Sequence, residues 1–263
     1  MKIAIEQAVI RAIDTMHENL GELLTIDDMA QAAMYSKFHF SREFQRVTGV
    51  SPRRFLSAIR IEAAKRLLLE TTATVTEISH RVGYNSVGTF SSRFAASVGV
   101  SPTMYRQLGG YTEEIVVDSR RRSAASGHST VRGEIRSEAT EELGQVFVGL
   151  FPSRIPQGRP AACTVLPRPG AFTLDRVPPG TWYLLAHSVP ASCEESLTAD
   201  REVFVGSVGP IEARPKVPLL PIELRLRPIG ALDPPVLLAL LDIRSAAFEQ
   251  DDAFDERPVA DAG

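Results

Sequence analysis

Residues 25–55 read TIDDMAQAAMYSKFHFSREFQRVTGVSPRRF, and residues 74–105 repeat nearly the same pattern as TVTEISHRVGYNSVGTFSSRFAASVGVSPTMY. Each copy ends on Gly-Val-Ser-Pro, at Gly49–Pro52 and Gly99–Pro102. The glycine of this ending suits a left-handed helix end, and the proline suits the first position of a following helix. The sequence therefore predicts two copies of one small helical unit.

Two helices are predicted in each copy. Thr25 with Asp28, and Thr74 with Glu77, match the capping box that begins a helix. The helix that follows is too short to be stable alone, so it must pack on a neighbour. After a tight turn of small or amide residues, a second helix begins at a serine, a favoured N-cap.

The second helix of each copy has an inner and an outer face. Phe40 and Phe44, like Phe90 and Phe94, lie four residues apart, so they share the face that we expect to turn towards the core. The intervening side chains then point outward and can touch bases and phosphates. They are Lys37, Phe38, Ser41, Arg42, Gln45 and Arg46 in the first copy, and Val87, Gly88, Ser91, Ser92 and Arg93 in the second.

Residues 53–70, between the copies, have a long helical pattern with Phe55, Ile59, Ala63 and Leu67 on one stripe. We interpret this segment as a rigid connecting helix that fixes the spacing of the two units. Two major-groove contacts on one face of B-DNA lie roughly 34 Å apart. The pattern suggests one chain that reads two adjacent grooves.

These residues resemble the AraC/XylS family of bacterial transcription regulators, whose DNA-binding domain is two such units joined by a long helix. The resemblance covers residues 5–108 and rests on residues 36–44, 83–86 and 90–94 and on both Gly-Val-Ser-Pro endings. It implies that base edges are contacted by Phe38, Ser41, Arg42, Val87, Gly88, Ser91 and Ser92, and that Lys37, Arg46 and Arg93 flank the DNA backbone.

Arg42 is the residue that we expect to discriminate most between bases. A guanidinium can donate two parallel hydrogen bonds to O6 and N7 of guanine, worth about 1–3 kcal/mol of discrimination. The second unit is chemically poorer, because Val87 and Gly88 offer no side-chain hydrogen bonds. It would read thymine methyl groups or groove shape. We therefore expect the first unit to carry more specificity.

Each of these features also has an interpretation that does not involve DNA. The repeat could be a protein-binding or structural module, and Phe38 could be a core residue. Tyr35 and Tyr84 fit packing better than base reading. His39 and His80 lie beside core positions and fit structural side chains better than ligands or switches.

Composition indicates two domains in the 263 residues. Residues 1–108 hold 13 Lys and Arg against 10 Asp and Glu, a net charge of +3, and the remainder holds 16 against 22, a net charge of −6. The cationic cluster in residues 42–66 is an electrostatic footprint suited to phosphate. Of the 18 prolines only Pro52 and Pro102 precede residue 150, which indicates a change of architecture.

Neither a signal-peptide pattern nor an apolar run long enough to cross a membrane occurs, so we expect a cytoplasmic protein that does not contact membranes. Cys163 and Cys193 are the two cysteines, and that compartment argues against a structural disulfide. Whether they form a redox-sensing pair is left open.

The second half reads as a β domain. Residues 131 onward show a period of two, with turns rich in Pro and Gly, which favours a β-sandwich. The segment GAFTLDRVPPGTWYLLA at residues 170–186 resembles the hairpin of transthyretin-like and carboxypeptidase-regulatory-like domains, which implies fold rather than ligand. The predicted strands are 146–151, 172–177, 181–186, 202–205, 222–227 and 236–243, and the last could instead be a helix.

A ligand pocket lined by Trp182, Tyr183 and His187 is one interpretation of this half. The plainer interpretation is that Trp182 belongs to the core and His187 lies on the surface. Nothing in the sequence names a ligand.

The fold class is thus multidomain α and β. We expect an all-α tandem helix-turn-helix domain at 1–110, a linker at 111–130 that includes Arg120–Arg122, an all-β sandwich at 131–248, and an acidic disordered tail at 249–263.

The predicted function is sequence-specific DNA binding that regulates transcription, with the sandwich used for effector sensing, dimerisation or both. The alternative is a sandwich that is purely an interaction module with no ligand. Double-stranded DNA is the expected partner, and RNA polymerase, a small-molecule effector and a second copy of the chain are left open. We predict no cofactor, metal site or catalytic residue, because no metal-ligand spacing, phosphate loop or nucleophile elbow occurs.

Overall fold

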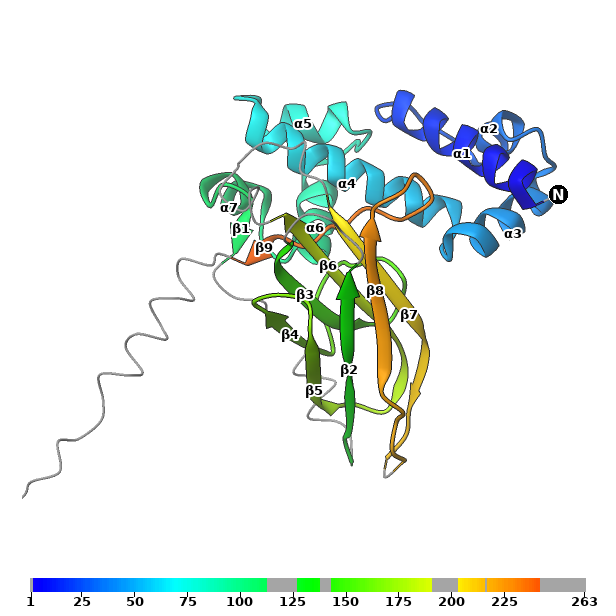
Figure 1. Cartoon of the computed structure of the whole chain (residues 1–263). Helices are drawn as coiled ribbons and strands as arrows, with labels where there is room; N and C mark the ends of the chain where they lie inside the picture. Colours follow the sequence, from blue (N-terminus) through cyan, green and yellow to red (C-terminus); the bar gives the residue numbers. More distant parts are fainter. Residues whose placement is uncertain (1, 113–126, 138–142, 191–202, 216, 242–263) are drawn as a thin grey trace, which may run out of the picture.

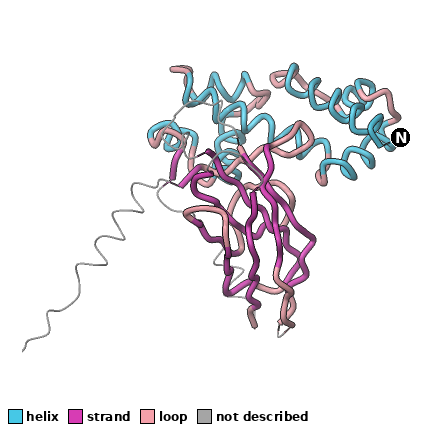
Figure 2. The backbone as a smooth tube through the Cα atoms, in the orientation of Figure 1, coloured by secondary structure: helices cyan, strands magenta, loops and turns pink. Residues whose placement is uncertain are grey.

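The structure is a computed structural model that describes residues 2–112, 127–137, 143–190, 203–215 and 217–241. We call residues 2–110 the helical half and the described residues from 127 onward the sheet half. Figure 2 shows that helices and strands form two separate regions in space. The predicted order of an all-α part followed by an all-β part is confirmed.

The helices of both repeat units and the long helix between them fall in the predicted places (Figure 1), whereas α1 at the start of the chain was not predicted. Their bounds are α1 Lys2–Glu18, α2 Ile26–Ala32, α3 Lys37–Thr48, α4 Pro52–Glu70, α5 Val75–Arg81, α6 Val87–Val98 and α7 Pro102–Gln107.

Both predicted capping boxes are present. The backbone N–H of Thr25 donates to the Asp28 carboxylate at 2.8 Å, and the Asp28 N–H donates to Thr25 Oγ1 at 3.2 Å. The same pair of bonds joins Thr74 and Glu77 at 2.7 and 3.2 Å. Hydrogen bonds from the two threonines lower the pKa of both carboxyl groups. The short helices α2 and α5 thus begin where the sequence predicts.

The two recognition-type helices end as predicted. Gly49 after α3 and Gly99 after α6 are left-handed, with φ of 79° and 101°. In this conformation a side chain would be strained, so glycine is the favoured residue. Proline then occupies the first turn of α4 and of α7.

Helix α4 differs from the prediction of a connector with a single apolar stripe. Leu67 is only half-buried, while side chains around most of the helix are buried. Buried side chains occur on several sides of α4, although its charged residues Arg53, Arg54, Arg66 and Glu70 are exposed. Helices of both units pack on α4. The buried residues are Pro52, Phe55, Leu56, Ala58, Ile59, Ile61, Ala63, Ala64 and Leu68.

Seven strands form one sheet in the sheet half, in the order β4-β3-β6-β7-β8-β2-β5. Within this seven-stranded sheet, β2 and β8 pair in parallel and the other neighbouring strands pair antiparallel. The strand bounds are β2 Ser129–Ser137, β3 Leu143–Phe151, β4 Ala162–Leu166, β5 Ala171–Val177, β6 Gly180–Pro190, β7 Phe204–Ala213 and β8 Ile222–Pro228.

The sheet curls around a core of its own. Its two parts, β4-β3-β6-β7 and β8-β2-β5, are hydrogen-bonded through a short strand pairing of Phe204 with Pro228 and Val205 with Arg227. Apolar side chains from both parts, including Val148, form one cluster between them. This nearly closed, all-β arrangement is compatible with the predicted sandwich.

Two short strands join the ends of the halves: β1 (Tyr111–Thr112) pairs in parallel with β9 (Leu240–Leu241). The predicted linker is therefore structured at its start, and β2 begins inside its other end. The rest of that linker at 113–126, with Arg120–Arg122, lies outside the described residues, as do Cys193 and the predicted tail at 249–263.

Most strand predictions agree with the structure, because 146–151, 172–177, 181–186 and 222–227 lie within β3, β5, β6 and β8. The predicted strand at 236–243 is wrong over 236–239: Leu237 and Ala239 are buried in the core of the helical half, and only Leu240–Leu241 are a strand. A helix is not found there either in the described part, 236–241. Strand β4 was missed, since its half-buried residues do not alternate.

None of the helices in the described ranges is both long and apolar enough to span a bilayer.

His187 on β6 is buried, with 5% of its surface exposed, so the surface histidine expected from the sequence is wrong. Strand β6 is central and is covered on both faces. The His187 ring lies 5.0 Å from the Phe147 ring, and its buried Nδ1 has no hydrogen-bond partner in the part of the chain that is described. Burial, and then the charge of Lys65, lower the pKa of His187 to about 4.

The free energy of unfolding should therefore decrease as the pH is lowered through the range in which His187 is protonated in the unfolded chain but not in the folded protein. Between pH 6.5 and about 4 the unfolded chain binds this proton and the folded protein does not. The contribution is fully present above pH 6.5 and decreases by about 3 kcal/mol as the pH falls to the folded pKa. Denaturant unfolding across this window should show a smaller loss for His187→Phe than for the unchanged protein. Equal losses in the two proteins would contradict the assignment.

Candidate nucleic-acid interface

The inner face of each second helix carries an aromatic ladder. The Phe40 and Phe44 rings lie 5.4 Å apart, and the Phe44 ring lies 5.4 Å from the Phe55 ring of α4. Edge-to-face packing of this kind adds to the stability gained from burial. The ladder fixes α3 against the core, as the sequence predicts.

The second unit repeats this ladder. The rings of Phe90 and Phe94 lie 5.7 Å apart, and Phe94 lies 5.5 Å from Tyr105 of α7. The third aromatic residue of each unit, three positions after the proline of Gly-Val-Ser-Pro, was not assigned this role from the sequence, although its recurrence is visible there.

The outer faces carry the ten predicted DNA-contacting residues, which we call the reader set. On α3, Phe38 is 87% exposed, so the alternative that it belongs to the core is wrong. Ser41 is half-buried, and its hydroxyl donates to the Lys37 carbonyl at 2.8 Å. The exposed members are Lys37, Phe38, Arg42, Arg46, Val87, Gly88, Ser92 and Arg93, and the half-buried members are Ser41 and Ser91.

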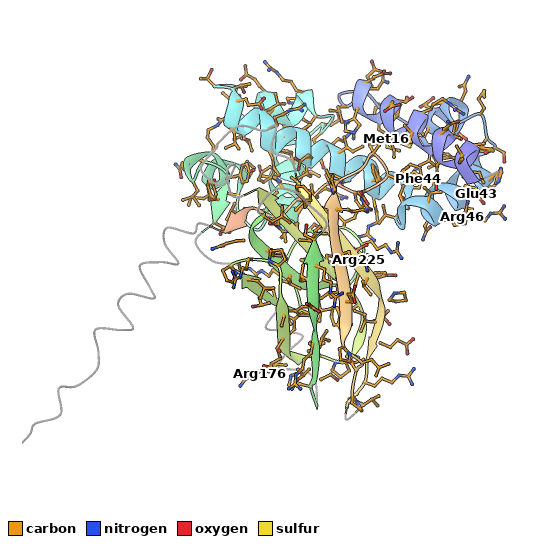
Figure 3. All side chains as sticks on the ribbon, in the orientation of Figure 1. Met16, Glu43, Phe44, Arg46, Arg176 and Arg225 are labelled. Carbon is orange, nitrogen blue, oxygen red and sulfur yellow. The ribbon has the colours of Figure 1, made fainter. Side chains whose placement is uncertain are left out.

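Glu43 organises the cations of α3 and was not singled out from the sequence. It is buried, and both Nε and Nη2 of Arg46 lie 2.8 Å from its Oε2. Arg42 Nε lies 3.6 Å from the other carboxylate oxygen, and His39 Nε2 lies 3.9 Å from it. The hydrogen bond from Arg46 is the main cause that lowers the pKa of Glu43. Glu43 and Arg46 lie next to each other in Figure 3.

The two units differ at this position. Glu43 precedes Phe44 in the first unit, and Arg93 precedes Phe94 in the second. Arg93 is exposed, so the second unit presents a cation where the first buries an anion. The signal for Glu43 was its position as the single acid among the cations of α3.

Two cations of the predicted phosphate footprint, Arg60 and Lys65, bind backbone carbonyl groups. Arg60 donates from Nη1 to the Gly83 carbonyl at 3.3 Å and from Nη2 to the Glu22 carbonyl at 2.7 Å. Lys65 is mostly buried and donates to the Val236 carbonyl at 2.8 Å. These two side chains hold the fold together, so the footprint is smaller than residues 42–66 suggest.

Arg60 joins parts of both units to the centre of α4. Glu22 lies in the loop before α2, and Gly83 lies in the turn between α5 and α6. Gly83 is left-handed with φ of 82°, and a Cβ there would lie 2.4 Å from the Leu20 carbonyl oxygen. The glycine is therefore required by close packing at this junction.

The two tyrosines of the turns pack as expected. Tyr35 lies 4.5 Å from the His39 ring, and Tyr84 lies 5.4 Å from the Phe90 ring. His80, however, is exposed on α5, so the prediction of a structural side chain is wrong for it.

The pocket considered in the sheet half is not formed by the three residues named for it. Trp182 lies in the core enclosed by the sheet and donates from Nε1 to the Pro178 carbonyl at 2.9 Å. Tyr183 packs in a different cluster, with Phe147, on the opposite face of β6. Cys163 is half-buried beside that second cluster. Trp182 is thus separated from Tyr183 and His187 by the sheet itself.

No group of three or more His, Cys, Asp or Glu side chains suited to a metal ion occurs within the described ranges.

Comparison with known proteins places the helical half in a family. Residues 29–108 match the family described as a helix-turn-helix domain. The HTH-type transcriptional activator AarP of Providencia stuartii is 31% identical over 103 residues, which are 39% of this chain and 76% of AarP.

Other relatives are matched over a smaller part of their length. YobQ of Bacillus subtilis, an uncharacterized HTH-type transcriptional regulator, is 35% identical over 95 residues, 36% of this chain and 39% of YobQ. Rv1931c of Mycobacterium tuberculosis, an HTH-type transcriptional regulator, is 42% identical over 82 residues, 31% of this chain and 32% of that protein. The chain thus spans well under half of these two relatives.

Solved structures give similar matches. An AraC-type transcriptional regulator from Chromobacterium violaceum is 25% identical, with a TM-score of 0.38, over 39% of this chain and 91% of that chain. The DNA-binding domain of AdpA, solved with a target DNA, is 29% identical, with a TM-score of 0.37, over 38% of this chain and 90% of that chain.

The inner and outer phenylalanines of α3 should respond differently to substitution. Phe40→Ala removes a ring that is 1% exposed and should lower the free energy of unfolding by about 3–5 kcal/mol. Phe38→Ala, at an exposed position two residues away, should change it by less than about 0.5 kcal/mol. Urea denaturation measures both. A large loss for Phe38→Ala would show that this ring is part of the core after all.

Proposed function

Because the chain belongs to the AraC/XylS family of transcription regulators, we propose that it is a sequence-specific DNA-binding regulator that reads two adjacent major grooves with α3 and α6. The observation that carries the proposal is the repeated geometry of these helices, with buried phenylalanines inward and the reader set outward. Recognition helices contact base edges mainly with their N-terminal residues. The starts of both helices are exposed.

The first unit supplies hydrogen-bonding readers. Arg42 is exposed and can bridge O6 and N7 of guanine. Phe38 and Ser41 lie on the same face and complete the base contacts, with the Phe38 ring suited to a thymine methyl group. Lys37 and Arg46 contact the flanking phosphates.

The second unit reads shape and methyl groups. Val87 and Gly88 allow close approach to the base edges without offering side-chain hydrogen bonds. Ser91 and Ser92 donate or accept at bases or phosphates, and Arg93 contacts the backbone. Specificity therefore comes mainly from α3, and α6 adds affinity and register.

The sheet half has a regulatory role in this proposal. It senses an effector, forms a dimer with a second copy, or does both, and the protein acts by binding rather than by catalysis. The competing interpretation is that this half is a structural interaction module with no ligand. RNA polymerase is the further partner that a regulator bound beside a promoter would meet.

A thermal-shift screen separates a sensor from a scaffold. A ligand that binds only the folded state raises Tm, by an amount that grows with its concentration over Kd. A concentration-dependent rise for one compound class would support sensing. A flat response across a broad panel of metabolites would support the scaffold.

Selection of binding sites from random duplexes tests DNA reading directly. The unchanged protein should enrich a motif, and Arg42→Ala should relax one guanine position by about 1–3 kcal/mol. Lys37→Ala is the matched control: it should weaken all sequences alike and reduce the salt dependence of binding by about one charge. No enriched motif from folded protein would contradict specific reading by the chain alone. Loss of guanine preference in Lys37→Ala would contradict the roles assigned.

A further inference from the structure

The loop between β3 and β4, residues 152–161, is the part of the sheet half that reaches into the helical half. Ile155 at its centre is 2% exposed and belongs to the helical core, together with Phe44 and Phe94 of the two recognition-type helices. The sheet thus anchors an apolar side chain in the core that both units share.

The first part of this loop contacts the end of α3 and the start of α4. A Cβ on Gly49, the left-handed residue that ends α3, would lie 2.3 Å from Arg154 Cδ, so Arg154 lies directly against that helix end. Its guanidinium lies 5.6 Å from the centre of the Tyr183 ring of β6. A cation beside a helix C-terminus is electrostatically favourable. Next to it, Arg54 Nη2 donates to Ser153 Oγ at 2.9 Å.

The last part of the loop contacts the end of α6. The backbone N–H of Gly158 donates to the Ser97 carbonyl at 2.7 Å. The Ser97 hydroxyl donates to Gln157 Oε1 at 3.3 Å. Gly158 is left-handed, with φ of 71°, and a Cβ there would lie 2.9 Å from the Ala96 carbonyl oxygen. The carbonyl groups that α6 leaves free at its end are thus partly satisfied by the sheet half.

A second segment of the sheet half supports this contact. The Leu237 N–H donates to the Pro156 carbonyl at 3.0 Å, and the Ala239 N–H donates to the Val98 carbonyl at 3.1 Å. Lys65 of α4 reaches the Val236 carbonyl at 2.8 Å. The loop is therefore held between the helical core and a strip of chain that is itself bound to α4 and α6.

From these contacts we propose that the loop at residues 152–158 is a positioning element that fixes the relative placement of α3 and α6, and so contributes to the preference for half-site spacing. The two units pack on α4, so bending of α4 would change the distance between their reader faces. One loop attached to the ends of both recognition helices removes that freedom. The inference rests on the function proposed above, because spacing matters only if both helices read DNA.

The loop lies away from the starts of α3 and α6, so these remain accessible to DNA. Its contacts at the ends of the recognition helices lie at Gly49 and at residues 96–97, whereas the reader set on α6 lies at residues 87–93. Docking of the sheet half therefore constrains the helices without covering the exposed starts of either one. This favours positioning over a block to DNA binding.

Two variants weaken the contact to different degrees. Ile155→Ser removes the apolar anchor, and Arg154→Ala removes only the side chain that lies on the end of α3. Arg168→Ala is the matched control, because Arg168 is exposed after β4, at the opposite end of the β3–β4 hairpin from the loop. Circular dichroism verifies that each variant is folded.

Pulsed electron paramagnetic resonance on the full chain without DNA measures the placement itself. Spin labels at Gln31→Cys on α2 and His80→Cys on α5, both exposed, report the distance between the units once Cys163 and Cys193 are changed to serine. We expect one narrow distribution of label-to-label distances in the protein with the unchanged loop and in Arg168→Ala. Broadening should be moderate in Arg154→Ala and larger in Ile155→Ser. Equal distributions in all four proteins would overturn the proposal.

Binding to duplexes with two half-sites, at the selected spacing and with one base pair added or removed, measures the consequence. The unchanged protein should prefer the selected spacing by at least about tenfold, and Ile155→Ser should lose most of that preference while binding a single half-site as before. If Ile155→Ser instead bound every spacing more tightly and kept the spacing preference, the loop would inhibit DNA binding, and the positioning role would be overturned. Because the resonance measurement contains no DNA, failure of DNA binding and failure of positioning are distinguishable.

Discussion

Burial of apolar side chains on several sides of α4 is the constraint on which the rest of the structure depends. Both units pack on this helix, and its buried side chains lie in one continuous core with Ile155, Leu237 and Ala239 of the sheet half. Arg60 and Lys65 extend from it to backbone carbonyls in the turns and in the sheet half. A change in the packing of α4 would therefore be felt by both recognition helices and by the domain attached to them.

The same scaffold carries two outward faces that differ chemically. The aromatic ladders, caps and left-handed glycines are repeated almost unit for unit, because they are needed to hold a short helix at a fixed angle. The outward residues are free of that requirement, and they differ. In the first unit the buried Glu43 carboxylate pairs with Arg46 and Arg42. The second unit has Arg93 at that position and no such pairing to a carboxylate at the equivalent site.

The helical half was predictable from sequence because its signals are local. The capping boxes, the Phe40–Phe44 spacing and the Gly-Val-Ser-Pro endings act within a few residues and recur in both copies. The contacts of Ile155 and residues 236–239 could not be predicted, since an apolar residue in a β domain is expected to face its own sheet. The burial of His187 was missed for the same reason: Leu238, far along the chain, packs with Phe147 and Leu185 on the second face of β6, and Lys65 of α4 lies near enough to lower the pKa of His187.

We propose that one chain places two recognition helices in adjacent major grooves on one face of the duplex. Hydroxyl-radical footprinting of the full-length protein on its selected site tests this most directly. We expect two protected regions separated by one helical turn, roughly 10–10.5 base pairs, on the same face of the DNA. A single protected region, or two regions on opposite faces, from a complex that contains one copy of the chain would contradict it.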